Sequence, residues 1–455
     1  MNIIIVGCGK VGYALAEQLN DEGHDITIID NSAERLQSAI NNLDVQVFVG
    51  NGTSFLAQKE AGIESADLLI AVTNADETNL ISCLIAKKAG SNCRTVARVR
   101  DPEYFSELEY IKAAMGISLI INPEYSVAQE IARLIQIPTA MEIDSFAKGK
   151  MELLRIVLPE DSDLDNMKVY EFSKLFNHDV LICILEHEHN IYIPNGNSIL
   201  HAGDSISVIM PRTKIAAFCK KLKLPTIREI KDVMIAGGGT TAYYLTELLA
   251  RGGLNVKIIE KDRERSRFLS LELPKAVIIH ADATTHENLL ENGLAKMDAF
   301  VSLTSSDEGN IFLSLYANKI APKCKKITKI SKMAQDDIIE DLPLGSVIST
   351  RHTTTEYILQ YIRSQINNSY GSNVEALYRL GENRVEALEF RIREKCAVTG
   401  IPLQELKLKE NLLLCSIVRG KKLITPSGKD TIELNDTVIV VTTHKCLRGI
   451  SDILK

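Results

Sequence analysis

Short apolar runs alternate with amphipathic segments through the first part of the chain. Ile3–Val6 has the length and β-branched content of a buried strand. Val11–Leu19 carries Val11, Leu15 and Leu19 on one face of a predicted helix. Further strands are predicted at Ile26–Ile29, Val45–Val49, Leu68–Thr73, Thr95–Val99 and Leu119–Ile121. This succession predicts a βα series and therefore an α/β fold with a parallel, doubly wound sheet.

A last helix of the series is predicted to begin at Pro123, where a missing N–H costs nothing in the first helical turn. The apolar side chains of this helix suit packing against another domain. A similar set of apolar side chains recurs far along the chain. The first set is Val127, Ile131, Leu134 and Ile135, and the second is Ile358, Tyr361 and Ile362.

Beyond residue 140 the apolar runs are shorter and are separated by Gly and Asn turns. A short helix around Phe172–Leu175 lies among them. Strands are predicted at Met151–Leu158, Val180–Glu186, Ile191–Pro194 and Ser205–Met210. This segment is therefore expected to form a small α+β lobe.

The whole pattern occurs twice. The loop that begins at Gly7 recurs at Gly237, 230 positions later, and Asp30 recurs as Glu260 at the same spacing. Further landmarks recur at 231 or 232 positions: Asp67–Thr73 as Asp298–Thr304, Asp76 as Asp307, Asn79 as Asn310, and Pro194–Gly196 as Pro426–Gly428. The duplication predicts two dinucleotide-binding sheet domains, at 1–140 and 226–370, each followed by a small lobe, at 141–225 and 371–455.

The first glycine loop lies between a predicted strand and a predicted helix, which is the context of a phosphate-binding turn. Gly7 permits the tight turn, Gly9 lets a pyrophosphate approach the backbone, and Gly12 lets the helix lie close to the sheet. The helix N-terminus offers free N–H groups to the phosphates. The candidate binding residues here are Gly7, Cys8, Gly9, Lys10, Val11 and Gly12.

Asp30 ends the next strand, where a carboxylate can accept hydrogen bonds from ribose hydroxyls. A ligand 2′-phosphate at ~4 Å would be repelled by roughly 4 kcal/mol at an effective dielectric constant near 20. The position therefore favours NAD(H) or an adenine nucleotide over NADP(H).

The second loop departs from the first. Thr240 and Thr241 stand where Lys10 and Val11 stood, so the basic side chain is lost, while Glu260 keeps the acid. The candidate residues of this loop are Gly237, Gly238, Gly239, Thr240 and Thr241. An empty or differently specific second site remains an alternative.

Polar residues follow the fourth strand of each half, where strand ends face the ligand crevice of such sheets. Thr73 and Asn74, and likewise Thr304 and Ser305, could contact phosphate or ribose, or could simply cap the next helix. Arg98 and Lys329 end the fifth strands. They could neutralise phosphate charge or be exposed cations.

The composition narrows the class of protein. Of 455 residues 45% are hydrophobic, and the net charge of −7 argues against a large nucleic-acid surface. Nine cysteines without Cys-x-x-Cys spacing indicate a reducing compartment. The N-terminus does not have the pattern of a signal peptide, and no apolar stretch is long enough to cross a bilayer.

Three other groups are interpreted as structural. His187-Glu188-His189 is expected to form a solvated turn and not a metal site, because no third ligand is evident. The Cys8 thiol is expected to matter less than its backbone. The run Lys220-Lys221-Leu222-Lys223 is expected to be a solvated helix end.

Taken together, these residues resemble the TrkA family, the regulatory subunits of bacterial Trk potassium uptake with tandem RCK (regulator of K⁺ conductance) units. The resemblance rests on the glycine loops, Asp30, Arg98 and the Asp67–Thr73 run with their counterparts. It adds Asn51, Gly52 and Asp282 as adenine-side candidates. The first half departs from the family here, because Gly50-Asn51-Gly52-Thr53 replaces the usual Gly-Asp-Ala-Thr type, which Ala281-Asp282-Ala283-Thr284 keeps.

The resemblance implies that NAD⁺, NADH or ATP/ADP binds in the crevice. It implies a homo-oligomer, as a tetrameric ring, in the cytoplasm on the inner face of the membrane. The implied partner is a potassium transporter subunit of the TrkH/TrkG type, gated by the ligand-dependent arrangement of the ring. No nucleic-acid partner is implied.

An NAD-dependent dehydrogenase is the main alternative, and a nucleotide sensor of another transporter is a further one. A dehydrogenase needs a further domain that binds the substrate and supplies acid/base groups. The repeats account for nearly every residue, and the small lobes present no recognisable His/Asp or Lys/Tyr pair in sequence. The sequence therefore favours a regulator over an enzyme.

Overall fold

A computed structural model describes the chain except residues 90–92, 106, 138–139, 148, 160–161, 178, 189, 223–229, 332–341, 350–353, 356, 360, 363–373, 381–383, 421, 446 and 448. His189, Lys223 and the predicted boundaries at 225/226 and 370/371 lie outside the described residues. The chain forms two compact units. Unit 1 comprises Met1–Ala132 and Lys231–Leu359, and unit 2 comprises Arg133–Ile230 and Gln360–Lys455.

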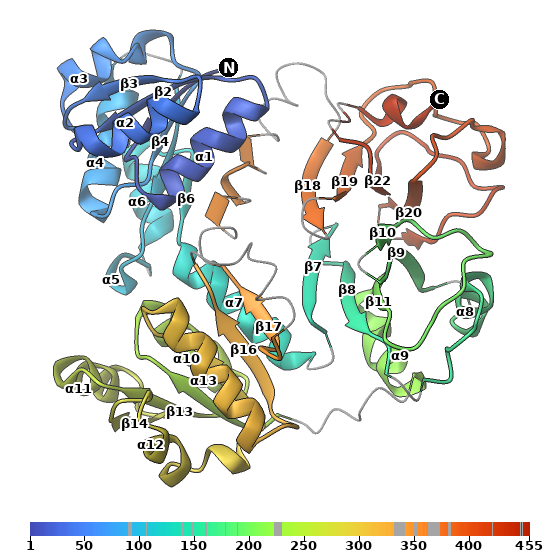
Figure 1. The fold of residues 1–455 in the computed structure, drawn as a ribbon. Coiled ribbons are helices and arrows are strands. Elements are labelled where there is room, and N and C mark those ends of the chain that lie inside the picture. Colours follow the sequence, from blue (N-terminus) through green and yellow to red (C-terminus); the bar gives the residue numbers. More distant parts are fainter. Residues whose placement is uncertain are drawn as a thin grey trace. The chain divides into compact units, whose positions relative to one another are not determined.

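The first sheet of unit 1 has the strand order β3-β2-β1-β4-β5-β6, with all neighbours parallel (Figure 1). This order reverses direction at β1, as in a doubly wound nucleotide-binding sheet, and confirms the predicted fold class. The strands are β1 (Asn2–Val6), β2 (Asp25–Asp30), β3 (Gln46–Val49), β4 (Leu68–Ala71), β5 (Arg94–Arg98) and β6 (Leu119–Ile121).

The second sheet repeats this order as β14-β13-β12-β15-β16-β17. The internal duplication is therefore confirmed at the level of topology. The strands are β12 (Asp232–Ala236), β13 (Asn255–Glu260), β14 (Val277–His280), β15 (Ala299–Ser302), β16 (Lys325–Lys329) and β17 (Ser346–Ile348).

Amphipathic helices connect the parallel strands. The first half has α1 (Lys10–Asp21), α2 (Ala33–Asn42), α3 (Phe55–Glu60), α4 (Asp76–Lys88), α5 (Pro102–Phe105), α6 (Leu108–Met115) and α7 (Pro123–Gln136). The second has α10 (Thr240–Arg251), α11 (Arg263–Glu272), α12 (His286–Glu291) and α13 (Asp307–Ile320). The expected apolar face of α7 is buried: Val127, Ile131, Leu134 and Ile135 are all at most 2% exposed.

Helix α10 of the second half contacts the first half inside unit 1. The Tyr244 hydroxyl donates to the carbonyl oxygen of Arg100 at 3.1 Å and accepts from the Asn122 amide at 2.9 Å. The Tyr125 ring meets the Tyr244 ring edge-on, with 5.4 Å between centroids. The two sheet domains are thus joined by a specific contact that the sequence pattern alone did not predict.

Unit 2 holds two antiparallel five-stranded sheets, β10-β9-β11-β8-β7 and β18-β19-β22-β20-β21. Strand β7 was not predicted, because its polar residues interrupt the alternation. The strands are β7 (Glu142–Phe146), β8 (Met151–Val157), β9 (Leu181–His187), β10 (Asn190–Tyr192), β11 (Ser205–Pro211), β18 (Val374–Leu380), β19 (Val385–Arg391), β20 (Leu412–Arg419), β21 (Lys422–Ile424) and β22 (Asp436–Thr442). The helices are α8 (Val169–Leu175) and α9 (Ile215–Lys221).

The two small lobes share one apolar core. Phe146, Met151 and Cys183 of the first lobe belong to the same buried cluster as Ala387 and Cys415 of the second. Among the described residues of either unit, no helix is long and apolar enough to cross a membrane.

Candidate functional site

The three glycines of the first loop differ in what surrounds them. Gly7 has a φ of +104°, and a Cβ there would lie 3.1 Å from the backbone of Thr73. A Cβ on Gly12 would lie 1.9 Å from the carbonyl oxygen of Gly7. By contrast, a Cβ on Gly9 would stand at least 4 Å clear of every described neighbour. The protein's own packing thus requires Gly7 and Gly12, whereas Gly9 leaves open space over the backbone at the start of α1.

Asp30 ties the glycine loop to the start of α2. One carboxylate oxygen accepts the N–H of Cys8 at 2.6 Å, and the other accepts the N–H of Ser32 at 2.8 Å. The Asp30 side chain is 8% exposed, and the guanidinium of Arg35 lies 3.9 Å from it. The acid therefore organises the glycine loop through bonds within the chain itself.

A cavity of about 420 Å³ opens beside this loop. Seven of the predicted residues line it: Gly7, Gly9, Asp30, Asn51, Gly52, Thr73 and Asn74. Further lining residues were not predicted, including Asn31, Ser32, Arg35 and Thr78. The other predicted residues of the first half are not among those that line the cavity: Cys8, Lys10, Val11, Gly12 and Arg98.

Asn79 of α4 fixes the end of β4. Its Oδ1 accepts the N–H of Thr73 at 2.8 Å and the Thr73 hydroxyl at 2.7 Å. Its Nδ2 donates to the carbonyl oxygen of Arg98 at 2.9 Å. In the second half Asn310 makes the same bonds to Thr304 and to the carbonyl oxygen of Lys329. The alternative that Thr73 and Thr304 simply cap the next helix is wrong, because the N-cap of α4 is Ala75, without a side-chain bond, and Ser306 caps α13. Thr73 lines the cavity instead.

Arg98 is buried and not an exposed strand-end cation. Its guanidinium donates to the Thr73 carbonyl oxygen at 2.6 Å and approaches Asn74 Oδ1 at 3.4 Å. Burial, and then the charge of Arg100, lowers the pKa of Arg98. Burial raises the pKa of Glu124, at the start of α7, and the two arginines oppose that rise. The strand ends therefore carry a buried group of opposite charges beside the crevice.

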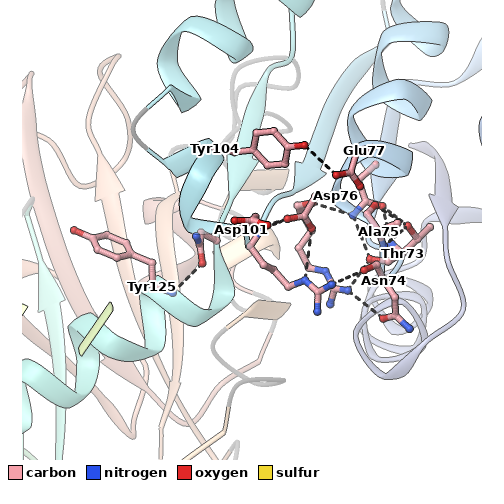
Figure 2. A network of polar contacts seen from close by, with 12 residues as sticks. Thr73, Asn74, Ala75, Asp76, Glu77, Asp101, Tyr104 and Tyr125 are labelled. Carbon is pink, nitrogen blue, oxygen red and sulfur yellow. Dashed lines mark hydrogen bonds and ion pairs between the residues drawn. The ribbon is translucent and has the colours of Figure 1, made fainter. Parts of the chain in front are cut away.

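Figure 2 shows a polar network along these strand ends. Asp76, at the start of α4, accepts the N–H of Arg100 at 2.7 Å and of Asp101 at 2.9 Å. The hydroxyl of Tyr104 donates to Glu77 at 2.9 Å. Because these bonds join the β4–α4 and β5–α5 turns, they hold Thr73 and Asn74 in place along the cavity.

Asn51 stands where the family usually has Asp, but the hydrogen bonds of the turn are the same as in the second half. The Oδ1 of Asn51 accepts the N–H of Thr53 at 3.0 Å and its hydroxyl at 2.9 Å. Asp282 accepts the same two bonds from Thr284, at 2.9 and 2.7 Å. Either residue type serves this turn, because only a carbonyl-type oxygen is needed.

The second site is built differently around its acid. Glu260 accepts the N–H of Gly238 at 2.5 Å and of Asp262 at 2.7 Å, as Asp30 does in the first. Arg265, which is equivalent to Arg35, donates from Nε to the carbonyl oxygen of Gly238 at 2.7 Å. Burial lowers the pKa of Arg265. This guanidinium is tied to the loop, whereas the exposed Arg35 lines the first crevice.

Lys329, predicted as a phosphate partner, is half-buried. Its ammonium group lies 3.5 Å from the carbonyl oxygen of Leu303, and burial lowers its pKa. Thr240 and Thr241 begin α10, and Thr241 is buried. Ser305 follows Thr304 beyond the end of β15.

The groups interpreted as structural are placed as follows. The Cys8 thiol is buried, and burial raises its pKa, which disfavours the reactive thiolate. The Lys221 ammonium lies 5.1 Å from the centre of the Phe176 ring and contacts the Leu175 carbonyl oxygen, so it is not simply solvated. Within the described residues, no group of three or more His, Cys, Asp or Glu is placed to hold a metal ion.

One expectation was wrong. The small lobes were expected to lack a His/Asp pair, but His187 Nδ1 lies 2.6 Å from Asp204 Oδ1. The residues are distant in sequence and become neighbours because β9 and β11 pair. At the equivalent positions of the second lobe, Arg419 Nη2 contacts Asp436 at 2.9 Å. The pair therefore belongs to a structural clamp that both lobes share.

The TrkA-N domain family matches residues 3–123 and 233–350, and the TrkA-C domain family matches 153–223 and 387–455. A protein of Archaeoglobus fulgidus, named Trk system potassium uptake protein TrkA homolog, is 31% identical over the full length of both chains. The chain belongs to the TrkA family. The TrkA of Vibrio alginolyticus is 30% identical, over 100% of this chain and 98% of that one.

Solved structures support the same fold for this TrkA family member. The GsuK channel superposes with a TM-score of 0.64 at 15% identity, over 98% of this chain and 77% of that one. A crystal structure of the GsuK RCK domain superposes with a TM-score of 0.63, over 98% of this chain and 92% of that one.

Among the cavity residues that were not predicted from the sequence, Arg35 did carry a signal. It recurs as Arg265 at the same spacing of 230 that relates Asp30 to Glu260.

Proposed function

We propose that this chain is a cytoplasmic, nucleotide-binding regulatory subunit that gates a membrane potassium-uptake protein. One observation carries the proposal. The open backbone at Gly9 adjoins a cavity of about 420 Å³ lined by Asp30, Thr73 and Asn74. A free helix N-terminus, a carboxylate and polar strand ends are the groups that a dinucleotide needs for its phosphates and ribose.

NAD(H) is the proposed ligand of the first crevice, with ADP or ATP as further candidates. Related solved structures include the GsuK channel bound to NAD and GsuK bound to ADP. The charge of Asp30 beside the ribose position favours NAD(H) over NADP(H). In the second half, Arg265 is bound to its own loop at Gly238, so we propose that this site has a different affinity or specificity.

A regulator is favoured over a dehydrogenase by the chemistry of the cavity. Of the described residues that line it, none is histidine, lysine, tyrosine or cysteine, and the one acid, Asp30, already holds two backbone N–H groups. Hydride transfer to or from a substrate needs an acid or base close to the nicotinamide. The lining supplies positioning groups instead.

The proposed mechanism is a shift of population between arrangements of a homo-oligomeric ring, as a tetramer, on the inner face of the membrane. The ligand can move that equilibrium only by its differential affinity for the two arrangements. The proposed partner is a transporter subunit of the TrkH/TrkG type, and the family names of the relatives support potassium as the ion. The residues proposed to contact the ligand are those predicted from the sequence in the first glycine loop and crevice, together with the predicted residues of the second half.

The test is calorimetric titration of NAD⁺, NADH, ATP, ADP and NADPH into the full chain. Gly9→Ala and Gly239→Ala form a matched pair, because an added Cβ at either position stands clear of the described neighbours. Gly9→Ala should weaken NAD(H) binding at least tenfold, about 1.4 kcal/mol, with an unchanged melting temperature. Gly239→Ala should leave the first binding event intact.

Potassium flux through the partner transporter in vesicles gives the second readout. NADH or NAD⁺ should change the flux with the wild-type chain and fail to do so with Gly9→Ala. A saturable reaction of NAD⁺ with an alcohol, hydroxy acid or amino acid at an ordinary turnover rate would instead favour the dehydrogenase. Equal loss of affinity from both glycine variants would contradict two separate sites.

A further inference from the structure

Two buried cysteines occupy equivalent positions in the small lobes of unit 2. Cys183 lies on β9 and Cys415 on β20, 232 positions later. Their side chains are 0% and 1% exposed. Each thiol donates to the carbonyl oxygen two residues before it, of Leu181 and Leu413, at the same distance of 3.6 Å. The duplicated lobes therefore hold their thiols in the same local geometry.

Cys183 is the extra residue of a β-bulge. Where β9 pairs with β11, Ser207 lies opposite Ile184, and the next residue, Val208, lies opposite Ile182. The ladder thus skips Cys183. A bulge changes the direction of the side chain that it carries.

Cys415 is the extra residue of the equivalent bulge in the second lobe. Where β20 pairs with β22, Leu414 lies opposite Val440, and Ser416 lies opposite the adjacent Ile439. Both lobes thus have a β-bulge at the equivalent cysteine.

The bulged strands meet. Strands β9 and β20 contact each other, and both cysteines belong to the one core cluster that joins the lobes. The Cys415 thiol interacts directly with that of Cys183, and burial followed by this contact raises the pKa of Cys415 well above its usual value. The thiols are neighbours across the line where the two lobes join.

We propose that Cys183 and Cys415 are an oxidation site at which peroxide forms a disulfide between the two small lobes. One thiol gives two electrons to the peroxide, becomes a sulfenic acid and releases one water. The second thiol attacks that sulfur, the S–S bond forms, and the hydroxyl leaves as a second water. Two thiols and one hydrogen peroxide thus yield one disulfide and two waters.

Burial makes the pair slow to react, because the thiolate is the reactive form and an apolar core disfavours it. The pair should therefore stay reduced at low peroxide and oxidise under sustained stress. The disulfide would close a loop of more than 200 residues, which restricts the unfolded chain strongly. The simpler reading is that these cysteines only fill a narrow space in the core, as small apolar residues do.

Peptide mapping distinguishes the two readings. The full-length protein is treated with hydrogen peroxide, quenched, alkylated in denaturant, digested without reductant and analysed by mass spectrometry. We expect one cross-linked peptide that joins Cys183 to Cys415, loss of the alkylated form of both cysteines, and reversal by dithiothreitol. The melting temperature of the oxidised wild type should rise, whereas that of peroxide-treated Cys183→Ala should not.

Cys396, which is partly exposed, reports that the oxidant has acted. The proposal fails if Cys183 and Cys415 stay open to alkylation after Cys396 is oxidised. It fails equally if they become sulfinic acids without a cross-link, or if urea-unfolded protein forms the same single cross-link in preference to pairings with the other cysteines. The peptide mapping is made on the wild-type chain, so a misfolded variant cannot obscure its result.

Discussion

The carboxylate of Asp30 accepts the backbone N–H of Cys8 at 2.6 Å. The acid that we expect to bind the ligand therefore also fixes the glycine loop. Its second oxygen accepts the N–H of Ser32. In the proposed function, the shape of the loop and the recognition of the ribose therefore depend on one side chain, so substitutions of Asp30 should act on both.

Asp30→Asn should destabilise the first sheet domain and weaken NAD(H) binding together. The amide has one accepting oxygen, so one of the two N–H groups loses its partner, at a cost of about 1–3 kcal/mol. Differential scanning calorimetry and NADH titration measure the two effects. Glu260→Gln is the matched control, and it should destabilise the second domain while the first-site affinity stays unchanged. A first-site affinity equal to wild type in Asp30→Asn would argue against the ribose role.

Asn79→Ala should lower the free energy of unfolding by about 2–4 kcal/mol. The side chain is fully buried and bonds the N–H and hydroxyl of Thr73 and the carbonyl oxygen of Arg98, which would lose their partner. Asn310→Ala breaks the equivalent bonds in the second domain and should cost a similar amount. Urea denaturation measures both. A loss under 0.5 kcal/mol in either variant, as is usual for surface sites, would contradict the proposed structural role.

Arg35→Ala should weaken nucleotide binding several-fold and weaken NADPH more than NADH. The Arg35 guanidinium lines the cavity near Asp30, where it can offset the charge of a 2′-phosphate. Calorimetric titration of both ligands gives the ratio. Arg265→Ala is the comparison, because that guanidinium is bound to the loop at Gly238, and it should leave the first site unaffected. An unchanged NADPH-to-NADH ratio in Arg35→Ala would show that Arg35 does not face the ribose.

The clamp of the first small lobe should weaken as pH rises, and that of the second should not. The hydrogen bond to Asp204 raises the pKa of His187, with Glu188 adding to the effect, and the His201 ring lies 4.9 Å away. A raised folded-state pKa means that the stabilisation is complete below about 6.5 and is lost as pH rises through the raised value. Arg419 keeps its charge throughout.

Hydrogen exchange of the β9–β10 hairpin, followed between pH 5.5 and 8.5, measures this effect. Protection of the hairpin should fall across the range in the wild type and become insensitive to pH in His187→Arg. Arg419→His should transfer the pH sensitivity to the second lobe. Equal pH dependence of both lobes in the wild type would exclude His187 as its source.

The succession of apolar runs was sufficient to predict the doubly wound sheets, since strand-forming runs linked by amphipathic helices have few other ways to bury their apolar faces. The fixed spacing of the repeats predicted the duplication. The Gly-x-Gly-x-x-Gly motif, with an acid at the end of the next strand, identified the loop and three of the residues that line the cavity, Gly7, Gly9 and Asp30.

Other relationships depended on the folded chain. Asp30 bonds Cys8, His187 meets Asp204, and Cys183 faces Cys415 because strand pairing and bulges bring together residues 17 to 232 positions apart. Local propensity and periodicity act over a few neighbours, so they determine which elements form. The register of the strands, the burial of residues and the direction of single side chains are decided only when the sheets and lobes pack. The contacts formed in this way set the charge and reactivity of each site.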